Sequence, residues 1–422
     1  MKKLLIMLLV TMCLVMPIFA TAQAEDTPES KTITLHFLGM AQAAYSEQNV
    51  NEMTADFMKE NPNIVVETEF VPYEELRNKT LLAYGSKTPY DVVLVDDIWF
   101  AEYNQKQLLN NISAMIPQSY KDGILNGGWN FVTKGGNVIG LPWFLDSMYL
   151  YYNKSMLKKA GFDNPPTSLE ELYSMAKTIK DKKIVDKPIV FSLAQAEALM
   201  CVYSNILEAY GGTFQNEKGE YSLDSTGGLK ALNYLVKLKN DGLLNESSLE
   251  YLEEDVRRVF SSGDAAFTLN WSYMYALAKD PAESQISPDD VGIMVLPGAK
   301  GIKKDAAMSG SMGLAVVSKT TNPDAALKYA LYLCSKEVQD TYSNLQLPVW
   351  KASYDDPKIQ EGRKDLVVAA KEAFSIMNAR PSDPNYQEAS SIFQEYIQNA
   401  LYGEITPETA LKEAVKKVNA IQ

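Results

Sequence analysis

Three clusters of aromatic and acidic residues carry the chemistry that this 422-residue sequence offers. They are Asp96 with Trp99, Trp143 and Phe144 with Asp146, and Trp271 with Tyr273 and Tyr275. Each lies just past the carboxyl end of a predicted strand or at a predicted crossing between lobes, where α/β folds place ligands. A flat ring covers the C–H face of a sugar while carboxylates, Asn and Arg bond its hydroxyls. The clusters therefore predict a sugar site; burial of these rings in a core is the alternative.

Most catalytic chemistry is excluded by composition, because the chain has one histidine, His36. A single histidine cannot supply a zinc-protease helix or a three-histidine metal site, and a serine triad lacks a credible base. Glycine-rich phosphate loops and calcium-binding loops are absent from the sequence. Asp96 and Asp97 are adjacent at a strand end and point to opposite faces, which disfavours a shared acid–base site. We expect no enzyme, no catalytic residue, no cofactor and no metal.

The charge balance argues against nucleic acid as a partner. Lys and Arg number 40 against 53 Asp and Glu, and the pI is near 4.8. An acidic chain cannot neutralise phosphates over an extended surface. The length indicates two or three domains, and 46% hydrophobic residues indicate an ordinary globular composition.

The first residues predict export. Lys2 and Lys3 precede an apolar run over 4–19, and Ala22-Gln23-Ala24 supplies a cleavage signal before Glu25; cleavage after Ala22 is the near alternative. Pro17 and the abrupt end of the run disfavour a retained anchor, and the residue before Cys13 disfavours lipidation. Residues 1–24 are thus a predicted signal peptide, and the mature chain a soluble protein of the periplasm or cell surface. Its cysteines, Cys201 and Cys334, are expected as buried free thiols.

Strands and helices alternate along the mature chain. Predicted strands cover 33–38, 64–70, 91–95, 148–152 and 265–270, and predicted helices cover 50–59 and 73–84. The first five elements give a βαβαβ order, which predicts a mostly parallel sheet covered on both faces. His36 falls in the first strand as a structural residue.

Local signals define the later elements. Ser168 with Glu171 forms a predicted capping box, and Asn322-Pro323 and Thr406-Pro407 each begin a predicted helix. Residues 214–223 predict a hairpin. No flexible linker separates the two α/β sections.

Short segments in a consistent order resemble the extracytoplasmic solute-binding proteins of sugar import systems, the group that includes maltose-binding proteins. The segments are Phe57–Pro62, Tyr90–Asp96, Gly140–Asp146, Leu150–Lys154, Phe162–Ser168, Gly263–Trp271, Gly313–Val316 and Ala379–Pro381. The resemblance implies a two-lobed α/β fold of the type II periplasmic-binding-protein kind, with three chain crossings at a hinge. Those crossings are expected near 145–147, 295–298 and 347–350. The lobes are then 25–145 plus 298–347 and 146–297 plus 348–422.

The resemblance also implies a function and a site. The chain is expected to bind a mono-, di- or oligosaccharide between its lobes, as a monomer, and to deliver it to the transmembrane subunits of an ABC permease. Carried over residue by residue, the ligand-binding set is Asp96, Trp99, Phe144, Asp146, Trp271, Tyr273, Arg380 and, from the segment 42–48, Glu47. Met312 stands where relatives commonly have a stacking tryptophan, so a smaller or differently oriented ligand is open.

Two alternatives stay open at this stage. A receptor for another solute, such as a polyamine, fits the acidity of the mature chain, which is −15 when residues 1–24 are removed (38 basic against 53 acidic residues). A secreted carbohydrate-active enzyme would use Asp96 and Asp146 as its carboxyl pair.

Overall fold

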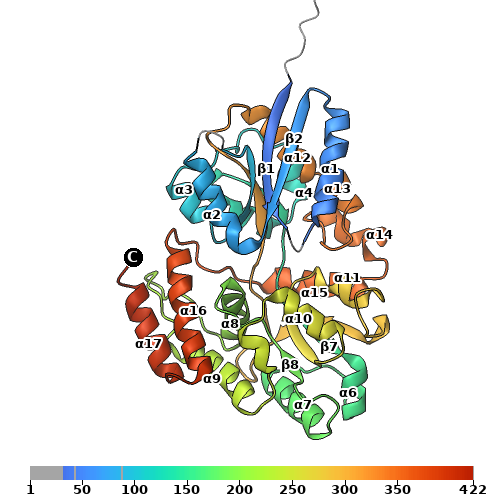
Figure 1. Ribbon diagram of the computed structural model, residues 1–422, viewed down its shortest axis with the longest axis vertical. Coiled ribbons are helices and arrows are strands. Elements are labelled where there is room, and N and C mark those ends of the chain that lie inside the picture. The colour runs from blue at the N-terminus through green and yellow to red at the C-terminus, as the bar shows by residue number, and fades with distance from the viewer. Residues whose placement is uncertain (1–31, 42–43, 87–88, 422) are drawn as a thin grey trace, which may run out of the picture.

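A computed structural model describes residues 32–41, 44–86 and 89–421. Two α/β lobes are stacked along the long axis, with the N-terminal elements in one lobe and the C-terminal helices in the other (Figure 1). The predicted two-lobed α/β architecture is confirmed. The predicted signal peptide, residues 1–24, lies outside the described residues. No helix within the described ranges is long and apolar enough to cross a membrane.

The first lobe is built on a five-stranded sheet of order β2-β1-β3-β13-β6. Its strands are β1 (Ile33–Met40), β2 (Ile64–Val71), β3 (Val92–Asp96), β13 (Met312–Val316) and β6 (Leu141–Phe144). β1 runs parallel to β2 and β3, as predicted, but β13 is antiparallel to both of its neighbours. The expectation of a mostly parallel sheet is therefore only partly correct. β1 and β3 run toward the second lobe, whereas β13 enters from it and runs the opposite way.

Helices cover both faces of this sheet. They are α1 (Glu47–Glu60), α2 (Tyr73–Tyr84), α3 (Phe100–Gln105), α4 (Gln118–Gly123), α5 (Asn126–Val132), α12 (Pro323–Leu333) and α13 (Lys336–Thr341). A small hairpin, β4 (Thr133–Lys134) with β5 (Asn137–Val138), follows α5. The predicted bounds of α2 are confirmed. α1 begins three residues before its predicted start because Ser46 Oγ accepts the Asn49 N–H and caps the helix there.

The second lobe is built on a four-stranded sheet of order β10-β7-β9-β8. Its strands are β7 (Tyr149–Asn153), β8 (Ile189–Val190), β9 (Phe267–Asn270) and β10 (Val291–Met294). Its helices are α6 (Lys154–Ala160), α7 (Leu169–Asp181), α8 (Glu197–Ala209), α9 (Thr226–Asn240), α10 (Glu253–Ser261), α11 (Met274–Lys279), α15 (Lys364–Ile376), α16 (Tyr386–Tyr402) and α17 (Pro407–Val418). Every residue of α8 is buried, because α9 and α16 pack against it. A helix so placed can aim its first turn at the space between the lobes.

The chain passes between the lobes at three places. The first passage, 145–148, joins β6 to β7 and includes the predicted range. The second was predicted at 295–298, but β11 (Leu296–Pro297) pairs there with β12 (Asp305–Ala306), and this hairpin packs on α8. The chain reaches the first lobe only at 309–311, so residues 298–308 lie with the second lobe, contrary to the predicted boundary. The third passage lies between α13 and α15, through α14 (Pro357–Gln360), and includes 347–350.

Smaller predictions are settled by side-chain contacts. Cys201 and Cys334 are buried and unbonded to one another, as expected. His36 lies in β1 with its ring 3.3 Å from the Glu67 carboxylate, consistent with a structural role. Residues 214–223 form a minimal hairpin, in which Gln215 bridges Tyr221.

Ser168 caps α7, since its Oγ accepts the Glu171 N–H at 3.2 Å. The Glu171 carboxylate bonds the N–H and hydroxyl of Thr167, one residue before the cap, so the predicted box closes on a different partner. We expect Ser168→Ala to lower the free energy of unfolding by about 1 kcal/mol, the usual cost of a lost cap. Urea denaturation measures it.

The matched control is Ser174→Ala, within the same helix, where the exposed hydroxyl bonds only a neighbouring carbonyl. Because Ala favours helix, this variant should be neutral or slightly more stable. Equal losses in the two variants would contradict the capping role.

Candidate functional site

A cavity of about 170 Å³ lies where the two lobes meet. The ends of β1 and β3, the start of α2, the first turns of α8 and α10, and the residues after β9 all reach it. The cavity is therefore lined from both lobes and from the passages that join them.

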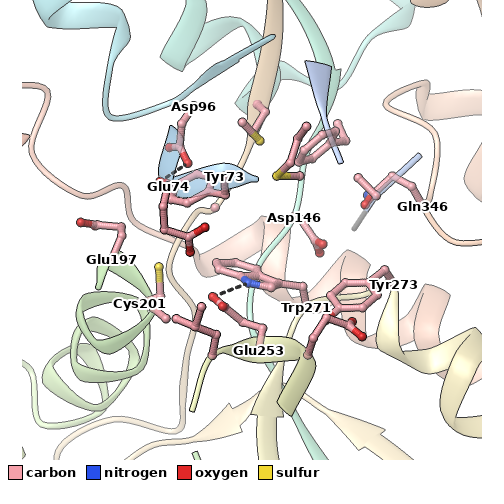
Figure 2. A pocket seen from close by; sticks show the side chains of 18 of the residues that line it. Tyr73, Glu74, Asp96, Asp146, Glu197, Cys201, Glu253, Trp271, Tyr273 and Gln346 are labelled. Carbon is pink, nitrogen blue, oxygen red and sulfur yellow. Dashed lines mark hydrogen bonds between the residues drawn. The ribbon is translucent and has the colours of Figure 1, made fainter. Parts of the chain in front are cut away.

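Carboxylates dominate the polar lining. Six acidic residues line the cavity: Glu74, Asp96, Asp146, Glu197, Glu253 and Glu254. Arg380 is the one basic residue that lines it within the described chain. Figure 2 shows the labelled acids entering from opposite sides of the cavity. An anionic ligand would face an unfavourable field in this site.

Arg380 joins the two lobes through a buried ion cluster. Its Nη2 lies 3.3 Å from Asp96 Oδ1 and 3.1 Å from Asp97 Oδ1 at the end of β3, and its Nη1 lies 2.6 Å from Glu197 Oε1 on α8. Its Nε–H is buried with no acceptor in the described part of the chain. Arg380 was predicted to bind ligand hydroxyls. Its two terminal nitrogens are already paired with acids of the protein, and only its Nε–H remains available to a ligand.

Each acid of this cluster also accepts a hydrogen bond from a hydroxyl group of the protein. Asp97 accepts the Ser309 hydroxyl at 2.6 Å, and Glu197 accepts the Tyr386 hydroxyl at 2.8 Å. Asp96 accepts the Tyr73 hydroxyl at 2.9 Å. Burial raises the pKa of Asp96 well above its usual range, Arg380 opposes this, and the like charge of Asp97 adds to it. Asp96 therefore accepts hydrogen bonds from Tyr73 and from Arg380 at the cavity wall.

Asp146 binds the passages between the lobes to one another. Its Oδ2 accepts the Ser272 N–H at 3.1 Å and the Ser272 hydroxyl at 2.7 Å, and its Oδ1 accepts the Ser147 N–H at 2.9 Å. Its main-chain oxygen accepts the Gly310 N–H at 3.1 Å, from the second passage. Burial raises the pKa of Asp146 to about 7, although these hydrogen bonds oppose the shift. Much of its bonding capacity is used inside the protein.

Trp271 projects into the cavity (Figure 2), and one face of its ring packs on Gly310. A Cβ built on Gly310 would lie 2.2 Å from the indole ring, so the ring packs directly on that backbone. Its Nε1 donates to Glu253 Oε1 at 3.4 Å. Both contacts fix the plane of the ring, which leaves it a preformed stacking surface.

The other predicted aromatic residues have different places. Phe144 lines the cavity beside Met312, its partner in the β6–β13 pairing. Tyr273 also lines it, although it is 97% buried in the second-lobe core. Trp99 does not line the cavity; it stacks on Tyr73 at 5.3 Å between ring centroids and so supports a ring that does.

One further predicted site residue lies away from the cavity, and several lining residues were not predicted from the sequence. Glu47 is exposed at the start of α1 and does not line the cavity, because capping by Ser46 places it on the first turn of a surface helix. Missed lining residues include Met40, Tyr73, Glu74, Glu197, Cys201, Glu253, Glu254 and Gln346. Glu74, Glu197 and Glu253 share one signal, an acid in the first turn of a helix. That pattern usually complements the helix dipole at a surface, so it does not by itself indicate a site.

Comparisons with known proteins agree with this geometry. The family described as "Bacterial extracellular solute-binding protein" matches residues 43–340. A solved structure titled "Maltose bound T. maritima MalE3" is 30% identical, covers 93% of this chain and 100% of its own, and has a TM-score of 0.84. A solute-binding protein of Agrobacterium radiobacter K84 in complex with ribitol has a TM-score of 0.85 at 22% identity, over 93% and 99% of the two chains. The "Probable ABC transporter-binding protein" of Deinococcus radiodurans is 28% identical over 76% of this chain and 77% of its own.

The contact between Gly310 and Trp271 generates one prediction. We expect Gly310→Ala to displace the indole, because an added methyl group has no room on that face. The tryptophan emission spectrum should shift, and accessibility to a neutral quencher should rise.

Gly85→Ala is the control, since the nearest atom to its added Cβ is 3.4 Å away and its φ is −74°. It should leave both signals unchanged. Wild-type fluorescence in Gly310→Ala would show that Trp271 does not rest on this backbone.

The raised pKa of Asp146 generates a second prediction. The unfolded chain ionises this carboxyl near pH 4 and the folded protein near pH 7. The contribution of the neutral Asp146 carboxyl to the free energy of unfolding is therefore complete below about pH 4, and it is lost as the pH rises to about 7. Asp146→Asn removes this loss, so the stability of the variant relative to wild type should be greater at pH 8 than at pH 5. Urea denaturation at both values tests it; a constant difference would contradict the shift.

Proposed function

Because the chain belongs to the bacterial extracellular solute-binding proteins, we propose that it is the sugar receptor of an ABC importer. One observation carries the proposal: a tryptophan ring held rigidly against backbone faces a wall of carboxylates in a cavity between two lobes. A ring that packs on C–H groups and carboxylates that accept O–H groups match the two kinds of surface that a sugar presents.

Trp271 would supply the stacking face, with Phe144 and Tyr273 completing the aromatic wall. Asp96 and the Nε–H of Arg380 would bond hydroxyls of the ligand. The likeness to a maltose-bound protein at 30% identity supports a saccharide as the ligand. Met312, which packs beside Phe144, makes this part of the wall flexible and apolar, in keeping with a mono-, di- or oligosaccharide that does not stack there.

Transport would use the passages at 145–148, 309–311 and between α13 and α15 as a hinge. A ligand that touches both lobes favours the arrangement in which they meet, since only that arrangement offers all of its contacts. Transmembrane subunits of the permease would then recognise the two lobes together. The protein would act as a monomer outside the cytoplasm, in the periplasm or at the cell surface, in keeping with the predicted signal peptide.

Hydrolysis has less support than binding. Asp96 and Asp146, the carboxyl pair that an enzyme would need, bond to Arg380 and Ser272 and so have little freedom to exchange protons with a substrate.

A polyamine is the second candidate, favoured by the six acids that line the cavity.

The test is a thermal melt of residues 25–422, refolded to remove bound ligand, against neutral sugars, amino sugars, polyamines and glycerol phosphates. A ligand at about 100 times its dissociation constant adds about 2.7 kcal/mol, which raises the midpoint by several degrees. A shift with one class of saccharide supports the receptor function. A response to polyamines alone would move the function to the second candidate, and silence from all would overturn both.

Trp271 should carry a measurable part of the affinity. We expect Trp271→Ala to weaken binding of the responding sugar by more than about 1 kcal/mol, because the stacking face is lost. Calorimetry measures this, with Tyr402→Ala as a control at an exposed ring outside the cavity lining. Unchanged affinity in Trp271→Ala would remove this ring from the site.

A further inference from the structure

The charges that line the cavity do not balance. Arg380 is spent on Asp96, Asp97 and Glu197, and these three acids already exceed it in number. Glu254 lies 2.9 Å from Arg257 and is paired. Asp146, Glu74 and Glu253 remain, and none of them forms an ion pair with a described residue. Asp146 accepts three hydrogen bonds from Ser147 and Ser272, whereas Glu253 accepts one, from Trp271, so Glu74 and Glu253 are the carboxylates with capacity to spare.

These two carboxylates come from opposite lobes. Glu74 is in the first turn of α2, and Glu253 is the first residue of α10. Figure 2 shows both side chains directed at the same part of the cavity, next to the indole of Trp271. Burial raises the pKa of Glu253, and the negative charges of Glu74 and Glu197 add to that shift. Glu74 and Glu253 therefore lie close enough to repel each other when the lobes meet.

A second, independent feature concerns the Nε–H of Arg380. This donor is buried in a residue that is 4% exposed, and it has no acceptor among the described residues. A buried donor without a partner costs free energy, so a ligand that supplies an acceptor gains by binding beside it. A hydroxyl supplies one; the protonated amines of a polyamine do not.

Resting on the proposed sugar-receptor function, we propose that the ligand is an amino sugar, or a saccharide that contains one, whose protonated amino group lies between Glu74 and Glu253. The ammonium would neutralise the repulsion that these carboxylates otherwise impose on the meeting of the lobes. Its position beside the Trp271 ring adds a cation–π contact. The hydroxyls of the same sugar would accept from Arg380 Nε–H and donate to Asp96. A neutral sugar makes only these hydroxyl contacts, and a polyamine makes only the contacts with Glu74 and Glu253.

The experiment compares matched sugars on wild-type protein by calorimetry. Glucosamine, galactosamine, mannosamine and the chitosan disaccharide are each measured beside the N-acetylated and the hydroxyl form of the same skeleton. For the skeleton that binds best, we expect the amine to bind at least tenfold more tightly than either uncharged form. Its affinity alone should fall as salt rises from 20 to 300 mM, because screening weakens a charged contact.

The variants Glu74→Gln and Glu253→Gln locate the charge. Each should reduce the ratio of amine to neutral affinity several-fold, a ratio that does not depend on how much of the variant is folded. Glu75→Gln is the matched control, since this neighbour is exposed like Glu74 and carries the same charge but does not line the cavity. It should keep the wild-type ratio.

The outcomes separate this inference from the proposed function. Equal binding of amine and neutral forms, or a preference for the neutral form, overturns the amino-sugar inference and keeps the sugar receptor. Binding of spermidine without any sugar overturns both. A preference for the amine that is unchanged in Glu74→Gln and Glu253→Gln overturns the assigned position of the amino group.

Discussion

The arrangement of the two lobes depends on the pairing of Arg380 with Asp96, Asp97 and Glu197. A buried guanidinium is tolerated only when it is paired, and here the partners come from the end of β3 in one lobe and the start of α8 in the other. Removing Arg380 would leave three acids in a dry site without a cation, so the cluster depends on this one residue. The cavity lies directly beside it, and a ligand that bonds Asp96 or Arg380 therefore acts on the same contacts that hold the lobes together.

The fold supplies this cluster because several elements end at one level between the lobes. β1 and β3 end there from the first lobe, and α8 and α10 begin there in the second. Asp146 ties the first passage to the second through the Gly310 N–H and to the second lobe through Ser272. Gly310, in turn, seats Trp271. One passage thus positions the main stacking ring, which couples the shape of the cavity to the geometry of the lobes.

Local sequence patterns predict many of the helices and strands, whereas contacts between distant residues are not predicted. The strands at 33–38 and 64–70 and the helix at 73–84 carry strong local patterns and are confirmed. Six of the eight predicted site residues line one cavity. Local pattern could not show that Trp99 lies behind Tyr73, that Glu47 falls on a capped surface turn, or that Arg380 is paired, because each depends on residues distant in the sequence. The second passage was misplaced for the same reason: the short β11–β12 hairpin on α8 keeps residues 298–308 in the second lobe.

The most direct test is a crystal structure of residues 25–422 with the sugar that stabilises the protein most. We expect the sugar between the lobes, with one face on Trp271, an oxygen within hydrogen-bonding distance of Arg380 Nε, and Arg380 still paired with Asp96 and Glu197. A sugar that contacts one lobe only, or one bound with Trp271 and Arg380 untouched, would contradict it.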